Sequence, residues 1–159
     1  MEDMLALRCL CRDFFVRRGV FGPPRAVRAV ADVSLALRKG ETLGLVGESG
    51  CGKSTLARMA AGLLHPSSGT VFLEGKALGS WDRLQRAKRM QMVFQDPTAA
   101  FNPKMRIRDI VCEPLINFDL ISKSEVDAKA RELLTQVDLP PDFVDRYPHN
   151  MSGGQRQRV

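Results

Sequence analysis

Eight consecutive residues decide the fold of this chain: Gly47-Glu48-Ser49-Gly50-Cys51-Gly52-Lys53-Ser54. They match the spacing G-x-x-x-x-G-K-[ST], in which glycines let successive backbone N–H groups point inward around one anion. A helix that starts at the end of such a loop adds the positive end of its dipole. The stretch therefore predicts a cradle for phosphate groups; the alternative is a chance glycine-rich turn.

The segments on both sides of this loop favour the cradle. Residues 42–46 form a short, nearly continuous apolar run, which predicts a strand buried on both faces. Residues 53–64 are rich in helix formers and carry an apolar stripe, which predicts a helix directly after the loop. Because the motif requires a strand before it and a helix after it, nucleotide binding is the expected function of the loop.

Neighbouring side chains of the loop have different expected roles. Lys53 is expected to reach the β- and γ-phosphates as a point charge, and the Ser54 hydroxyl is expected to ligate Mg²⁺. Thr55 would supply a further hydroxyl or amide near the α-phosphate. Cys51 stands at a variable position of the loop, and no chemical role is expected for it.

Alternation of apolar and polar side chains predicts two strands before the loop. Residues 5–12 would place four side chains on one face of a strand, namely Leu5, Leu7, Cys9 and Cys11. Residues 32–37 alternate in the same way, after a connection rich in glycine and proline over 19–24. The two strands are expected to pair in an antiparallel sheet.

Strands and helices continue after the loop. Residues 70–73 and 90–94 are expected to form strands, with Trp81 and the basic run 83–89 as solvated surface between them. Beyond residue 97 the pattern becomes helical. The chain therefore predicts an α/β core followed by a helical insert.

Two features mark a helix in the insert. Residues 122–125 have the Ser-x-x-Glu spacing of a capping box. An apolar stripe then runs over 126–137 and is ended by two prolines at 140–141.

Composition excludes several classes of protein. The chain has 159 residues, a formal net charge of +6, 44% hydrophobic and 26% charged residues, which is typical of one globular domain or a part of one. No apolar run approaches the roughly 20 residues that span a bilayer, and the acidic start is unlike a secretory signal, so the cytoplasm is expected. The four cysteines are expected to be reduced thiols. Scattered basic residues without interleaved aromatics argue against a nucleic-acid partner.

A second motif identifies the kind of nucleotide-binding protein. Met151-Ser152-Gly153-Gly154-Gln155 resembles the signature motif of ATP-binding cassette (ABC) ATPases. A serine hydroxyl and two glycine amides that open a helix can hold a phosphate. The resemblance implies that Ser152, Gly153, Gly154 and Gln155 hold the γ-phosphate of an ATP on the opposite subunit's phosphate loop. Met151 stands where leucine is commonest, a change that conserves size.

The resemblance assigns further residues. Met92-Val93-Phe94-Gln95-Asp96-Pro97 looks like the family's Q-loop, which implies that Gln95 contacts Mg²⁺ and the attacking water. Phe14, or else Phe15, stands where the family stacks an aromatic ring on adenine, with ordinary core packing as the alternative. His149 is interpreted as a surface or capping residue. The implied catalytic residues are Lys53 and Gln95, the implied metal ligands are Ser54 and Gln95, and the implied nucleotide-binding residues are Phe14, Gly47, Glu48, Ser49, Gly50, Cys51, Gly52, Lys53, Ser54 and Thr55.

Three stretches resemble the ATP-binding subunits of dipeptide and oligopeptide importers. They are residues 46–55, residues 94–97 with 102–104 and 113–115, and residues 146–149. Nickel-importing relatives share much of this pattern. The resemblance implies ATP and Mg²⁺ as cofactors and a place on the cytoplasmic face of the inner membrane. It also implies a second cassette, identical or paralogous, two membrane permeases and, indirectly, a substrate-binding protein as partners.

The expected fold is a P-loop NTPase core with an N-terminal antiparallel β subdomain over about 1–96 and a helical subdomain over about 97–155. Complete cassettes continue with an Asp-Glu pair, an aspartate-containing loop and a switch histidine, which are not found before Val159. The sequence is therefore expected to be truncated at its C-terminus, and this piece alone to be inactive and poorly stable. Two alternatives are a nucleotide-binding fragment without turnover and a cassette ATPase that acts on DNA or ribosomes.

Overall fold

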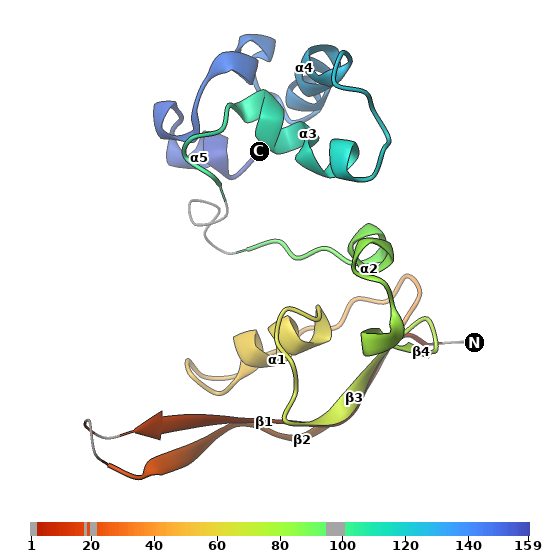
Figure 1. Ribbon diagram of the computed structural model, residues 1–159, viewed down its shortest axis with the longest axis vertical. Helices are drawn as coiled ribbons and strands as arrows, with labels where there is room; N and C mark the ends of the chain where they lie inside the picture. The colour runs from red at the N-terminus through yellow and green to blue at the C-terminus, as the bar shows by residue number, and fades with distance from the viewer. Residues whose placement is uncertain (1–2, 18, 20–21, 95–100) are drawn as a thin grey trace. The chain divides into compact units, whose positions relative to one another are not determined.

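A computed structural model describes residues 3–17, 19, 22–94 and 101–159 of the chain (Figure 1). The chain divides into two compact units, Met1–Gln91 and Met92–Val159. Each unit has its own hydrophobic core, so the two are described separately.

The first unit is built on a four-stranded antiparallel sheet with the strand order β2-β1-β3-β4. Its strands are β1 (Asp3–Arg17), β2 (Pro24–Arg38), β3 (Ser68–Leu73) and β4 (Lys76–Ala77). The expected antiparallel pairing of the two N-terminal strands is confirmed, with Leu5 opposite Leu37 and Leu7 opposite Leu35.

A β-bulge in β1 interrupts the alternation that was expected over residues 5–12. The register with β2 shifts between Leu7 and Leu10, where Cys9 adopts a positive φ of 49° and donates its N–H to Ser34 Oγ at 2.9 Å. Leu7 and Leu10 are both buried in the core, whereas Cys9 is exposed. An extra residue in one strand moves every later side chain to the other face, which alternation alone does not predict.

Helix α1 (Lys53–Ala60) lies over this sheet (Figure 1) and buries Leu56 and Met59 in the core. The helix ends earlier than the predicted residue 64. Gly62 adopts a φ of 69°, and the N–H groups of Gly62 and Leu63 donate to the carbonyls of Met59 and Arg58. These two bonds form a Schellman motif, which ends a helix by satisfying its last carbonyls.

The buried strand expected at 42–46 and the strand expected at 90–94 are not formed. Val46 and Val93 are both 97% exposed. A strand of a parallel sheet is stabilised by partners along both edges, and in the described part of the chain no strand pairs with either segment. Apolar composition alone therefore did not suffice to make a strand.

The surface between β4 and residue 90 differs partly from the prediction. Helix α2 (Arg83–Arg89) buries no residue, as expected for a solvated basic run. Trp81, in contrast, packs against the core, and its indole N–H donates to the Leu73 carbonyl at 3.3 Å. The guanidinium of Arg89 and the ammonium of Lys76 lie 4.5 and 5.0 Å from its ring centroid. The interpretation of Trp81 as a solvated residue was wrong, because its side chain packs against the core and bonds to the backbone of β3.

The second unit is helical, as predicted. It contains α3 (Ile107–Asn117), α4 (Val126–Gln136), two 3-10 turns (Pro141–Asp145 and Pro148–Asn150) and α5 (Gly153–Arg156). The apolar stripe of α4 buries Val126, Ala130 and Leu134 as expected. Its core joins residues from α3, α4 and the 3-10 turn at 141–145 with two residues of the connections, namely Ile107, Cys112, Val126, Ala130, Leu134, Leu139, Phe143, Val144 and Met151.

The capping box predicted at 122–125 is half formed. The Glu125 carboxylate accepts hydrogen bonds from the backbone N–H and the hydroxyl of Ser122, at 2.8 and 2.6 Å. The Ser122 hydroxyl is thereby turned to Glu125 and Ser124 rather than to a backbone N–H of the helix. Only the reach of the acidic side chain back to the serine follows the box.

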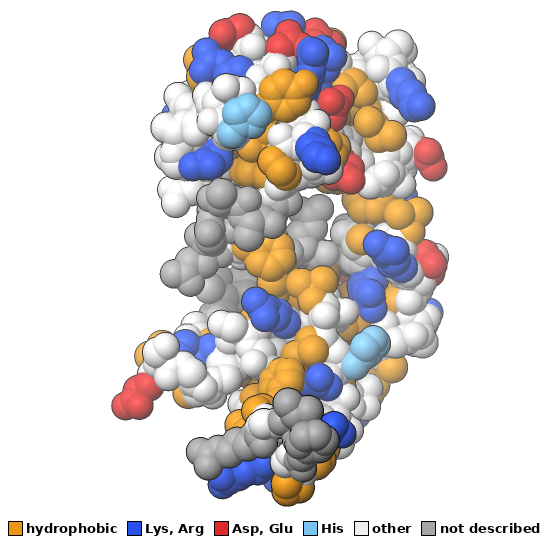
Figure 2. Space-filling model, turned by 60° about the vertical axis from the view of Figure 1, so that its left-hand side comes forward, with side chains coloured by type: hydrophobic (Ala, Val, Ile, Leu, Met, Phe, Trp, Pro, Cys, Tyr) orange, Lys and Arg blue, Asp and Glu red, His pale blue; other side chains and the backbone are white. Residues whose placement is uncertain are grey.

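Surface chemistry is mixed. On the face shown in Figure 2, Lys and Arg side chains are dispersed among apolar and polar ones in both units. All four cysteines are free thiols. Among the described residues, none of the helices has the length and apolar character needed to cross a membrane.

Replacement of Leu134 by Ala should lower the free energy of unfolding of the helical unit by about 2–5 kcal/mol, because Leu134 is 1% exposed and its truncation leaves a cavity. Urea denaturation followed by far-UV circular dichroism measures the effect. Leu120→Ala is the matched control, since Leu120 is 62% exposed and its loss should change stability by less than about 0.5 kcal/mol. Equal effects of the two substitutions would contradict this description of the core.

Candidate functional site

The loop at 47–52 leads into the first residue of α1, and the Lys53 side chain turns back into it. Lys53 Nζ donates to the carbonyl oxygens of Gly47 and Glu48, at 2.7 and 2.6 Å, and lies 3.4 Å from Cys51 Sγ. The loop thus holds an ammonium group inside its own curve. These contacts to loop carbonyls were not anticipated from the sequence.

Glycine is required at two positions of the loop. Gly50 and Gly52 have φ angles of 83° and 99°, which side chains rarely adopt. A Cβ on Gly52 would lie 2.2 Å from the Ala29 carbonyl oxygen of β2. Gly52 therefore lets α1 start directly against the sheet, and this contact fixes the direction of the helix start.

The start of α1 offers unpaired donors. The first intrahelical bond runs from the Leu56 N–H to the Gly52 carbonyl, at 2.8 Å. The N–H groups of Lys53, Ser54 and Thr55 precede it and have no carbonyl of their own helix to bond. The first turn carries no acidic side chain. These donors, the helix dipole and the Lys53 ammonium make the loop electropositive and fit for a phosphate chain.

Gly47 leaves the inside of the loop free of a side chain at its own position. A Cβ on Gly47 would lie 2.8 Å from Cys51 Sγ and 4.0 Å from Lys53 Nζ, so a side chain there would enter the curve of the loop. The Ser54 hydroxyl is on an exposed residue at the second position of the helix. The residues present therefore fit a nucleoside triphosphate with its Mg²⁺.

Phe14 lies in β1 at the end of the sheet, opposite Val27 of β2. It is 37% exposed and does not belong to the core, and the Arg12 guanidinium covers its ring at 4.8 Å from the centroid. Phe15 is 73% exposed. The alternative of ordinary core packing therefore fails for both rings.

Ser152 caps α5 through a full capping box. Ser152 Oγ accepts from the Gln155 N–H at 3.3 Å, and Gln155 Oε1 accepts from the Ser152 N–H at 2.9 Å. The serine hydroxyl still has its own proton to donate, and the N–H groups of Gly153 and Gly154 begin the helix without intrahelical partners. The spacing Ser-x-x-Gln is readable in the sequence, so this box could have been predicted.

Other residues singled out in the sequence are placed as follows. Met151 is 5% exposed and anchors the turn before Ser152 in the helical core. His149 is exposed, as expected, and stacks on Tyr147 with ring centroids 5.6 Å apart. Gln95 lies outside the described residues. The phosphate loop and Phe14 belong to the first unit, whereas residues 152–155 belong to the second.

Comparison with known families and curated proteins gives a consistent result. The family model described as "ABC transporter" matches residues 30–159. The chain is 44% identical over 163 residues to the oligopeptide transport ATP-binding protein AppF of Bacillus subtilis (strain 168), covering 99% of the chain and 50% of the relative. It is 44% identical over 162 residues to the di/tripeptide transport ATP-binding protein DppF of Pseudomonas aeruginosa (strain UCBPP-PA14), covering 100% and 50%. The chain spans about half the length of the curated relatives it matches.

A solved structure shares the fold. The dimeric structure of a post-hydrolysis state of the ATP-binding cassette MJ0796 bound to ADP and Pi matches with a TM-score of 0.77 and 27% identity, covering 98% of this chain and 66% of that one. The expected cassette fold with a mixed α/β core and an antiparallel sheet is thereby confirmed.

Replacement of Gly52 by Ala should destabilise the first unit by about 1–3 kcal/mol, because a methyl group would both strain a positive φ and meet the Ala29 carbonyl. Urea unfolding measures the loss, and hydrogen exchange should show faster exchange of the amides at the start of α1. Gly79→Ala is the control, since a Cβ there meets nothing within 4 Å. If Gly52→Ala proved as mild as the control, the close contact with β2 would be wrong.

Proposed function

The chain belongs to the ABC transporter family, and from that premise we propose that it is part of the ATP-binding subunit of an importer that takes up peptides. The proposal is carried by one observation: the loop carbonyls hold the Lys53 ammonium beside the unpaired donors at the start of α1. The names of the curated relatives support peptides as the cargo class. Nickel is the alternative cargo, because nickel importers resemble this chain in much of the same pattern.

The proposed ATPase site uses residues 47–55. Bound Mg-ATP supplies the phosphoanhydride that water cleaves. Lys53 exchanges its carbonyl contacts for the β- and γ-phosphate oxygens, which is favourable because a full negative charge replaces two carbonyl dipoles. The N–H groups at the start of α1 hold the phosphates in line, and the Ser54 hydroxyl is the proposed metal ligand. Gln95 is the second proposed metal ligand and orients the water.

The remaining proposed contacts to the nucleotide lie at a distance along the chain. Phe14 stacks on adenine with one ring face, while Arg12 covers the ring from its other side. Ser152, Gly153, Gly154 and Gln155 form the second half of a site. They hold the γ-phosphate of an ATP bound to a partner cassette, identical or paralogous, and the dimeric form of the MJ0796 cassette supports such pairing.

Coupling to transport follows from this arrangement. ATP closes two cassettes on each other, hydrolysis separates them, and residues 97–155 with Gln95 pass the movement to two membrane permeases. Residues 1–96 would then form the nucleotide-binding core and 97–155 the helical subdomain. The proposed location is the cytoplasmic face of the inner membrane, with a substrate-binding protein as an indirect partner.

Lys53→Ala in the full-length protein should abolish ATP-driven uptake, because the β- and γ-phosphates lose their only proposed point charge from a side chain of the loop. Uptake of labelled peptide by proteoliposomes that carry the assembled transporter measures this. Lys39→Ala removes an exposed lysine from the turn after β2 and should leave uptake unchanged. Normal uptake by Lys53→Ala would overturn the assignment.

Ser152→Arg should separate nucleotide binding from closure. Binding of ATP by the isolated full-length subunit should stay within about twofold of the native value, because the phosphate loop is unaltered, while ATP-dependent dimerisation should be lost. Equilibrium binding and size-exclusion chromatography measure the two quantities. Ser124→Arg, an exposed change in the same helical unit, is the control and should alter neither. Loss of ATP binding by Ser152→Arg but not by Ser124→Arg would contradict the proposed role of the motif at the partner's nucleotide.

A further inference from the structure

The segment that leads into Ser152 is tied to the first turn of α3. The Ile107 N–H donates to the Arg146 carbonyl at 2.9 Å, which satisfies one donor at the start of that helix. One residue earlier, Asp145 Oδ1 accepts from Arg106 Nη1 at 2.8 Å and from Arg108 Nη1 at 3.1 Å. A backbone bond and two ion pairs therefore hold the chain seven residues before Ser152.

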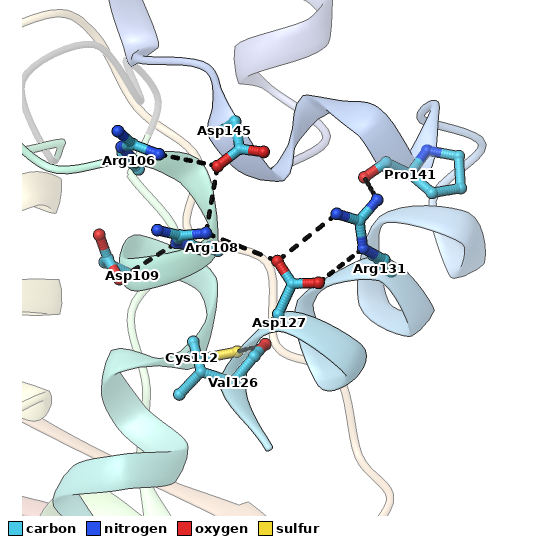
Figure 3. Close-up of polar contacts among 9 residues, drawn as sticks. All are labelled: Arg106, Arg108, Asp109, Cys112, Val126, Asp127, Arg131, Pro141 and Asp145. Carbon is cyan, nitrogen blue, oxygen red and sulfur yellow. Dashed lines mark hydrogen bonds and ion pairs between the residues drawn. The ribbon is translucent and has the colours of Figure 1, made fainter. Parts of the chain in front are cut away.

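Arg108 extends these contacts to α4. Figure 3 shows its guanidinium between Asp145 and Asp127, with Arg108 Nη1 3.5 Å from Asp127 Oδ1. Arg131 Nε lies 2.8 Å from Asp127 Oδ2, and Arg131 Nη1 donates to the Pro141 carbonyl at 3.3 Å. The charges therefore link three elements: the start of α3, the start of α4 and the 3-10 turn at 141–145.

Neighbouring cations favour the charged form of Asp127. The hydrogen bond from Arg131, followed by the charges of Arg131 and Arg108, lowers the pKa of Asp127. The hydrogen bonds of Tyr147 and Asp145 raise the pKa of Arg106.

These pairs contribute little to holding the unit folded. The side chains of Arg108, Asp127 and Asp145 are 32%, 49% and 55% exposed, and exposed ion pairs are individually weak. The buried core of the unit supplies the stability. The network instead restricts the path of the chain from Asp145 to Ser152. Pro148 and Met151 are buried along this path, which links the position of Asp145 to that of the turn.

We propose that Asp145, held by Arg106 and Arg108, is a positioning residue that aims the Ser152–Gln155 turn at the partner cassette's nucleotide. The proposal rests on the proposed function, in which that turn contacts a γ-phosphate across a dimer. Asp145 itself touches no nucleotide; it acts through the backbone between Arg146 and Met151. A turn misplaced by about an ångström loses on the order of tenfold or more in a step that depends on its geometry.

The test compares ATP binding with ATP-dependent dimerisation in the full-length subunit. Asp145→Asn should weaken dimerisation about tenfold, leave ATP binding by the monomer unchanged, and lower Tm no more than the control does. The control is Lys129→Gln, which breaks the pair between Lys129 and Glu132, 2.8 Å apart on α4 and outside the network. Asp145→Glu keeps the charge and should recover most of the dimerisation.

A double-mutant cycle sharpens the result. Arg108→Gln should also weaken dimerisation, and the double variant should be no weaker than Asp145→Asn alone, because both changes break one linkage. The positioning role would be overturned if Asp145→Asn dimerised like the native protein or if Lys129→Gln lost as much dimerisation. It would also be overturned if the losses of Asp145→Asn and Arg108→Gln added up in the double variant. If Ser152→Arg dimerises normally in the same assay, the proposed function fails and the positioning role with it. If Ser152→Arg loses dimerisation while the Asp145 variants dimerise like Lys129→Gln, the proposed function stands and only the positioning role of Asp145 fails.

Discussion

The unpaired backbone donors at the start of α1 are the constraint on which the rest of the first unit depends. A helix start leaves N–H groups without partners, and here Gly52 brings that start against the Ala29 carbonyl with no space for a side chain. The sheet therefore sets the direction of the donors, and the donors make the start of α1 fit for an anion. The ammonium of Lys53 lies in the same curve of the loop, so backbone and side chain concentrate positive charge at one place.

The second unit also presents a helix start with unpaired N–H groups, but different contacts hold it in place. Ser152 and Gln155 cap a short helix by exchanging hydrogen bonds, which leaves two glycine N–H groups outward at its start. Here the support is a run of exposed ion pairs at Asp145 together with buried Pro148 and Met151. A rigid sheet aims one helix start, and a charge network on a helical core aims the other. The proposed site, assembled from two chains, needs both helix starts to be oriented before the chains meet.

Much of the site was readable from spacing because local chemistry determines it. The loop motif needs glycine for its φ angles and a helix to follow, and both are properties of neighbouring residues. The apolar stripe at 126–137 and the pairing of the two N-terminal strands follow from periodicity in the same way. Non-local facts were not readable: the packing of Trp81 and the meeting of Arg108 with carboxylates on three elements.

By itself, the sequence determined the phosphate loop, the helical character of the second unit and the family, because each depends on residues within one turn or one motif. Only the tertiary structure decided that Cys9 is turned outward at a bulge and that residues 42–46 and 90–94 form no strand. It also decided that Asp145 joins the start of α3. The physical reason is the same in each case: strand pairing and ion pairing are contacts between segments far apart in the chain, and composition cannot specify which segments meet.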